Sequence, residues 1–107
     1  MAAPLEKASG QPTVSYNFEG LAVAGSAVGF TAGVIDPSDG TPAISAHVSV
    51  ETAQVRYRTD GTDPTASVGS ILDPGDEFVV WGTQDIRSIR FIRTGGVSAT
   101  LNTQFAR

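Results

Sequence analysis

Apolar and polar residues alternate in several short segments of this chain, and this pattern constrains the fold more than any other feature of the sequence. The clearest case is residues 97–106, where Val97, Ala99, Leu101 and Phe105 alternate with small polar residues. Successive side chains of a β-strand point to opposite faces, so the pattern predicts a strand with one buried face. No window of about 11 residues shows the helical period of about 3.6 residues. We therefore expect an all-β fold.

Turn-forming residues divide the chain into about seven or eight such segments, a spacing typical of a β-sandwich or jelly roll. The turns include DPSDGTP at residues 36–42, Pro74-Gly75 and Gly95-Gly96. The segment 21–35 is apolar with three internal glycines, and we interpret it as a strand with a bulge. Strands are expected at residues 13–18, 21–35, 44–51, 55–58, 78–81, 88–94 and 97–106.

Residues 13–107 are therefore expected to form a single β-sandwich or jelly-roll-like domain. Residues 1–12, MAAPLEKASGQP, contain two prolines and no periodicity, and we interpret them as an extended N-terminal arm that orders against a partner. The expected core consists of the apolar residues at alternating positions: Val14, Phe18, Phe30, Val48, Val50, Val55, Tyr57, Phe78, Val80, Ile89, Phe91, Leu101 and Phe105.

A hairpin is expected over residues 44–58, with Thr52 and Ala53 in the turn. This register would place Val50 opposite Val55 and would give the hairpin one apolar and one polar face. Thr-Ala is a poor two-residue turn, because neither residue favours a positive φ, so a longer loop is the alternative.

Composition excludes several classes of function. The chain has 107 residues, a net charge of -4 and no cysteine, which rules out disulfides, thiolate zinc sites and cysteine nucleophiles. The negative net charge opposes nonspecific binding to nucleic acid or to anionic lipid. The N-terminal sequence has no basic region followed by an apolar run, so we expect neither a membrane span nor export.

No catalytic or cofactor-binding constellation is found in the sequence, and we expect a protein that is not an enzyme and needs no cofactor. His47 is the only histidine, which excludes a multi-histidine metal site, and a G-x-S-x-G elbow is absent. The aspartates of DGTDPT, Asp60 and Asp63, lack the spacing of a calcium loop. Turn chemistry explains them, so we expect this loop to be structural and free of metal.

Arginines are concentrated on or beside the predicted strands. The structural interpretation is a solvated sheet face with weak cross-strand ion pairs and no binding role. The functional alternative is a protein-docking face, because Arg forms bidentate hydrogen bonds to carboxylates and is enriched at interfaces. The residues of the expected docking face are Arg56, Arg58, Arg90, Ile92 and Arg93.

The segment VRYRTDGTDPTASVG at residues 55–69 resembles small structural proteins of tailed bacteriophages. The shared pattern is V-R-[YW]-R-x-D-G-T-x-P-T-A-S-V-G, followed by a strand of the form G-D/E-x-F and by I-R-F-I. It covers roughly residues 48–106, and in the first half of the chain only the Gly- and Ala-rich alternation is similar.

The resemblance implies a capsid decoration or cement protein. Such a protein would be made in the cytoplasm of the bacterial host and would bind the major capsid protein on the capsid surface of the virion, often as a homotrimer. A carbohydrate- or receptor-binding module of a phage tail or fibre is the alternative, with Trp81, Tyr16 or Tyr57 as stacking platforms. A small β-barrel enzyme is a third class, which would need a convergent polar pocket.

Overall fold

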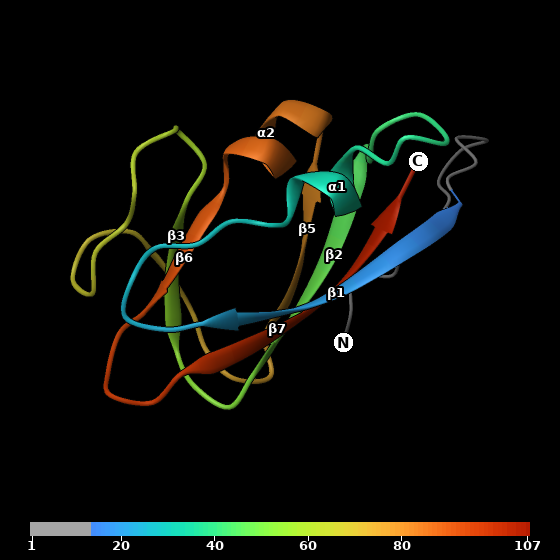
Figure 1. The fold of residues 1–107 in the computed structure, drawn as a ribbon. Coiled ribbons are helices and arrows are strands. Elements are labelled where there is room, and N and C mark those ends of the chain that lie inside the picture. Colours follow the sequence, from blue (N-terminus) through green and yellow to red (C-terminus); the bar gives the residue numbers. More distant parts are fainter. Residues whose placement is uncertain (1–13) are drawn as a thin grey trace.

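The computed structural model describes residues 14–107, and the predicted arm at residues 1–12 lies outside this range. The described chain forms seven strands in two antiparallel sheets, with two short helices, which confirms the expected all-β sandwich (Figure 1). Sheet A has the strand order β1 (Ser15–Val23), β7 (Ala99–Ala106), β2 (Ser45–Glu51) and β5 (Glu77–Trp81). Sheet B has the order β4 (Ser70–Leu72), β3 (Val55–Arg58) and β6 (Arg90–Arg93). The helices are α1 (Ala32–Ile35) and α2 (Thr83–Ser88).

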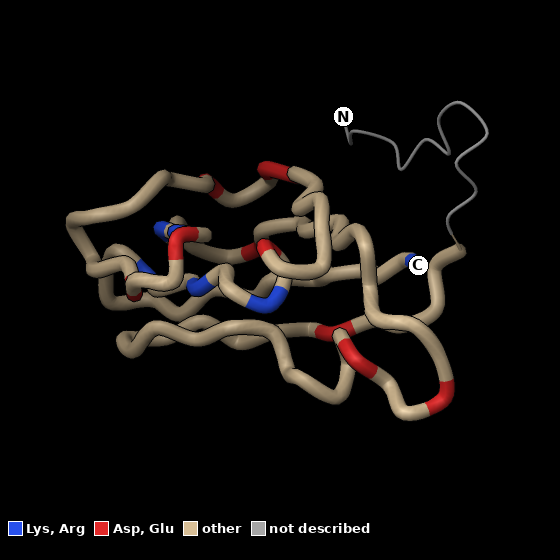
Figure 2. Tube along the Cα trace, turned by 90° about the horizontal axis from the view of Figure 1, so that it is seen from above, with Lys and Arg blue, Asp and Glu red and all other residues tan. Residues whose placement is uncertain are grey.

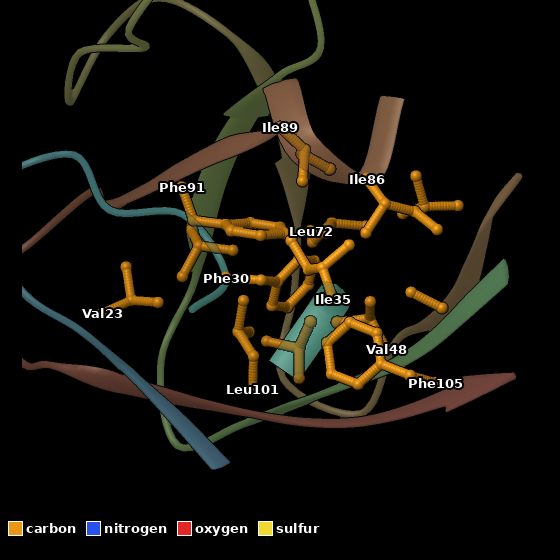
Figure 3. Close-up of a cluster of buried hydrophobic side chains, with 14 of the residues drawn as sticks. Val23, Phe30, Ile35, Val48, Leu72, Ile86, Ile89, Phe91, Leu101 and Phe105 are labelled. Atoms are coloured by element: carbon orange, nitrogen blue, oxygen red, sulfur yellow. The ribbon is translucent and has the colours of Figure 1, made fainter. Parts of the chain in front are cut away.

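Three phenylalanines connect the two sheets across the core (Figure 3). The ring of Phe30 lies 5.4 Å from that of Phe91 in sheet B and 5.1 Å from that of Phe105 in sheet A, both in edge-to-face geometry. Such pairs contribute about 0.5–1.5 kcal/mol beyond the burial of their area. Phe30 lies on the irregular segment between β1 and α1, so this segment fills the space between the sheets.

Most of the expected core is confirmed. Tyr57 and Phe78 are half-buried, and their rings pack against each other with centroids 5.2 Å apart at the margin of the core. The expected core residues that the structure buries are Phe30, Val48, Val50, Val55, Val80, Ile89, Phe91, Leu101 and Phe105.

Two expected core residues are exposed, Val14 by 64% and Phe18 by 54%, so their assignment to the core was wrong. Val14 lies before β1, opposite Arg107. Phe18 is exposed because of a bulge in β1: Ser15 pairs with Ala106 and Asn17 with Phe105, which leaves Tyr16 as the extra residue. The hydroxyl of Tyr16 donates to the backbone carbonyls of α1. The extra residue shifts the alternation by one, and Phe18 therefore faces outward.

The expected hairpin over residues 44–58 is also wrong. Strand β2 pairs with β5 and β7, whereas β3 pairs with β4 and β6, so the connection between them crosses from sheet A to sheet B. Thr52 has a φ of 82° and the Ala53 N–H donates to the Glu51 carbonyl, which turns the chain sharply out of sheet A. Val50 and Val55 are both buried, but they belong to different sheets.

The segment 21–35 is not one continuous strand as expected. Its first residues complete β1, Val28 forms an isolated bridge with Phe91, and residues 32–35 form the single turn of α1. The bridge has hydrogen bonds in both directions, of 2.9 and 2.8 Å, so this segment extends sheet B beyond β6. The expected strand at 88–94 is shorter, because Ser88 ends helix α2 and β6 begins at Arg90.

Helix α2 was not predicted from the sequence. It spans two turns at most, which is too few to show a helical period in the sequence. Its residue Ile86 is completely buried.

Leu101→Ala should lower the free energy of unfolding by about 2–5 kcal/mol, because the side chain is fully buried in the central strand pair of sheet A and its loss leaves a cavity. Chemical denaturation measures the change. Gln104→Ala, at an exposed position of the same strand, is the control and should change stability little. A loss at Leu101 no larger than at Gln104 would contradict this assignment to the core.

Thr103→Val should raise the free energy of unfolding by about 1 kcal/mol. The Thr103 hydroxyl is fully buried and has no hydrogen-bond partner within residues 14–107, so its desolvation is uncompensated. Valine keeps the shape of the side chain and removes the polar group. Thr100→Val, on the outer face of the same strand, should have a much smaller effect. Destabilisation by Thr103→Val in chemical denaturation would show that the hydroxyl is satisfied.

Candidate docking face

The register of sheet B places four of the five expected contact residues on its outer face. Arg56 pairs with Ile92 on β6 and with Ile71 on β4, and one step along the same face Arg58 pairs with Arg90. Phe91 and Tyr57 alternate with them and point into the core. We call Arg56, Arg58, Ile71, Arg90 and Ile92 the docking face.

Ile71 is a member of this face that the sequence analysis did not identify. It is 45% exposed, directly across from Arg56. Ile71 and Leu72 are adjacent in β4 and therefore point to opposite faces, and only Leu72 is buried. This strand has three residues, too few for the pattern to be recognised without its partner.

Arg56 is held by the loop that connects β3 to β4. Its Nε donates to the Ala66 carbonyl at 3.1 Å, and its Nη1 donates to the Gly69 carbonyl at 2.7 Å. Carbonyl groups orient a guanidinium without neutralising it. Arg56 therefore keeps its charge in a fixed position on the docking face.

Arg90 is held in a similar way at the other end of the face. Its Nη1 donates to the carbonyls of Arg87 and Ile89, each at 2.8 Å. The guanidinium lies close against Gly29, where an added Cβ would come within 2.5 Å of Nη1. Glycine at this position therefore leaves the space that Arg90 occupies.

Arg58 differs from these two, because it forms a bidentate ion pair with Asp60 (Nε to Oδ1, 3.1 Å). These hydrogen bonds lower the pKa of Asp60, to which a hydrogen bond from the Thr62 backbone N–H also contributes. The same hydrogen bonds raise the pKa of Arg58. The charge of Arg58 is thus largely balanced, so Arg56 and Arg90 supply most of the positive potential of the face.

Arg93, the fifth expected contact residue, is separated from the other four. It pairs with Val55, whose side chain is fully buried, and by alternation it starts from the opposite side of β6. Its guanidinium donates to the Ser98 hydroxyl at 3.0 Å and lies beside Gly25. Its charge is therefore directed toward the junction of β6 and β7.

Charge is segregated between the two sheets. The strands of sheet A carry Glu19, Glu51 and Glu77 and no Lys or Arg, whereas those of sheet B carry four arginines and no Asp or Glu. Most Lys and Arg positions gather in one part of the fold, whereas the Asp and Glu positions are spread more widely (Figure 2). A chain with a net charge of -4 thus presents one basic face.

The described residues offer little for acid-base or metal chemistry. His47 Nε2 lies 3.0 Å from Glu77 Oε1 without hydrogen-bond geometry, on the outer face of sheet A. Between residues 14 and 107, no three His, Cys, Asp or Glu side chains are grouped so that they could hold a metal ion. None of the helices in that range is long and apolar enough to span a membrane.

Comparison of the chain with protein-family models, curated proteins and solved structures found no match. The interpretation of the docking face therefore depends on its own geometry.

Arg58→Gln should raise the pKa of Asp60 toward the ordinary carboxyl value, because the hydrogen bonds of Arg58 are the largest cause of its lowering. The pair stabilises the fold above the ordinary carboxyl pKa, and this stabilisation is lost as the pH falls through the lowered value. NMR titration of the side-chain carboxyl carbon measures the shift. Arg93→Gln is the control and should leave Asp60 unchanged, and an Asp60 pKa insensitive to Arg58→Gln would contradict the ion pair.

Proposed function

We propose that this protein is a non-enzymatic structural protein of a phage virion, a decoration or cement protein that binds the assembled capsid through the docking face of sheet B. The observation that carries this proposal is the pair of charged, fixed guanidinium groups of Arg56 and Arg90. Ile92 neighbours both of them, and Ile71 lies on the other side of Arg56. The preferred partner is an acidic protein surface, and the resemblance in residues 48–106 suggests the major capsid protein.

The physical character of the face supports a protein partner. An arginine already held by backbone carbonyls loses little conformational entropy when it binds a carboxylate, and its planar fork can still present unused N–H groups. Ile71 and Ile92 supply apolar area on either side of Arg56, as in the mixed composition of protein interfaces. Because the global charge is negative, attraction to an acidic shell depends on this local patch.

The loop sequence on which the resemblance depends has a structural role under this proposal. Residues 59–69 turn the chain between β3 and β4, and the carbonyls of Ala66 and Gly69 in this loop hold Arg56. The first residues of the motif thus supply Arg56 and Arg58, and the loop that follows holds Arg56 in position.

Assembly as a homotrimer is part of the proposal. A chain of this size without disulfides has a small core, and subunit contacts stabilise it by mass action. Attachment of three linked copies to a symmetric shell also increases avidity. The expected contribution of the arm at residues 1–12 to shell binding stays a prediction, because those residues lie outside the described range.

Charge reversal at Arg90 tests the proposal. The binding partner in the test is capsids of the same phage, stripped of this protein. The variant Arg90→Glu should lose most of its binding to these capsids, because it places a carboxylate against an acidic surface. Co-sedimentation measures the binding. The melting temperature of the variant should change less, since the side chain is partly exposed. High salt should also weaken the binding of the wild-type protein to capsids, because it screens the same charge interaction that the Arg90→Glu substitution reverses.

Arg93→Glu is the matched control, since it makes the same charge change on the same strand, away from the docking face. Equal loss of binding in both variants would indicate a general charge effect. A wild-type protein that stays monomeric at high concentration and does not co-sediment with capsids would overturn the proposal and favour a tail or receptor-binding role.

A further inference from the structure

A cavity of about 550 Å³ lies beside the docking face, at the end of sheet B. It is a depression open to solvent and not an enclosed cavity, although its volume is within the range of small-molecule sites. The cavity opens where β3 ends and β4 begins, next to the connecting loop, which projects at the left of Figure 1, away from the C-terminus. Its lining residues are Tyr57, Arg58, Thr59, Asp60, Val68, Gly69 and Ser70. All belong to the motif of residues 55–69 or directly follow it, and the docking role accounts for only one of them.

The wall of the cavity is held in place by hydrogen bonds. Arg56 binds the carbonyls of Ala66 and Gly69 from outside the cavity, and so fixes the loop on which Val68 and Gly69 lie. Gly69 has a φ of 136°, and a Cβ there would lie 3.1 Å from the Tyr57 carbonyl, so the two sides of the cavity approach closely at this residue. A preformed wall lowers the entropy that a ligand must offset.

The polar groups of the cavity offer both donors and acceptors, with no excess charge. Arg58 and Asp60 are paired, but each retains hydrogen-bonding capacity that the pair does not use. Thr59 and Ser70 add two hydroxyl groups, while the exposed Val68 adds apolar surface. Because the charges of Arg58 and Asp60 balance, the cavity does not favour an ionic ligand.

From this arrangement we infer that the cavity binds a neutral saccharide. Adjacent hydroxyls of a sugar ring both donate and accept hydrogen bonds, which matches a carboxylate beside a guanidinium. The C–H face of the ring is apolar and suits contact with Val68. This inference goes beyond capsid attachment, because Asp60, Val68 and Ser70 line the cavity and lie outside the docking face. Arg58 is the one residue that the cavity and the docking face share.

The cavity is open, so a single site binds weakly, and many copies on one particle would combine weak sites into strong attachment to a glycan-covered surface. The docking face and the cavity would then bind different partners, the shell and a carbohydrate ligand, with Arg58 at the boundary between them.

The test is an NMR titration of the ¹⁵N-labelled full chain with glucose, galactose, mannose and N-acetylglucosamine, each added separately. We expect saturable shifts for at least one of these sugars, centred on residues 57–60 and 68–70. Glucuronic acid should give weaker shifts than the best neutral sugar, because the cavity has no unmatched positive charge. The absence of a response to all four sugars, shifts centred elsewhere, or a preference for glucuronic acid would each overturn the inference.

Asp60→Asn should weaken the neutral-sugar response by about tenfold or more, since it removes a charged acceptor. The same variant leaves Arg58 without its counter-charge, so its response to glucuronic acid should increase. Asp63→Asn is the matched control, in the same loop but outside the cavity lining, and should behave as wild type. If Asp60→Asn does not fold, Thr59→Val and Ser70→Ala remove the hydroxyls and leave the ion pair intact. An unchanged sugar response in both of these would also overturn the inference.

Discussion

The contact of Phe30 with Phe91 and Phe105 is the interaction on which the rest of the structure depends. The two sheets share no strand, and within the described residues these rings join them at the centre of the core. The segment that carries Phe30 also covers the edge of β6 through the bridge of Val28 to Phe91. Gly29 lies between Val28 and Phe30 in the sequence and contacts Arg90. The segment that joins the sheets therefore also shapes one end of the docking face.

Under the proposed function, sheet B combines structural and recognition roles in the same arginines. Arg56 fixes the loop after β3 and also presents a charge, while Arg58 balances Asp60 at the cavity. Carbonyl partners and carboxylate partners have different consequences: the first leave a basic face, and the second leaves a neutral, hydrogen-bonding site. This difference in partner chemistry distinguishes the proposed docking face from the adjacent cavity on one short sheet.

Part of the candidate site could be predicted from sequence. Alternation on β6 placed Arg90 and Ile92 on one side, since two residues along a strand share a face. The same alternation puts Arg93 on the opposite side of β6, so the sequence already separated it from them. That Ile71 joins them follows only from the pairing of β4 with β3. The cavity likewise depends on pairing, since it requires Tyr57 and Ser70 to meet across residues 58–69.

By itself the sequence determined an all-β sandwich and most of its core, because a period of two and frequent turn residues are local properties that any folded form of this chain must satisfy. Only the tertiary structure decided which strands pair. Val50 and Val55 satisfy the same alternation whether they face each other in a hairpin or belong to opposite sheets, and burial is equally complete in both cases. The bulge at Tyr16 was decided in the same way: the ring hydroxyl finds carbonyl partners on α1, and this reverses the side on which Phe18 lies. Helices of one or two turns form here because neighbouring sheets bury Ile35 and Ile86, and contacts of that kind are not encoded in any local pattern.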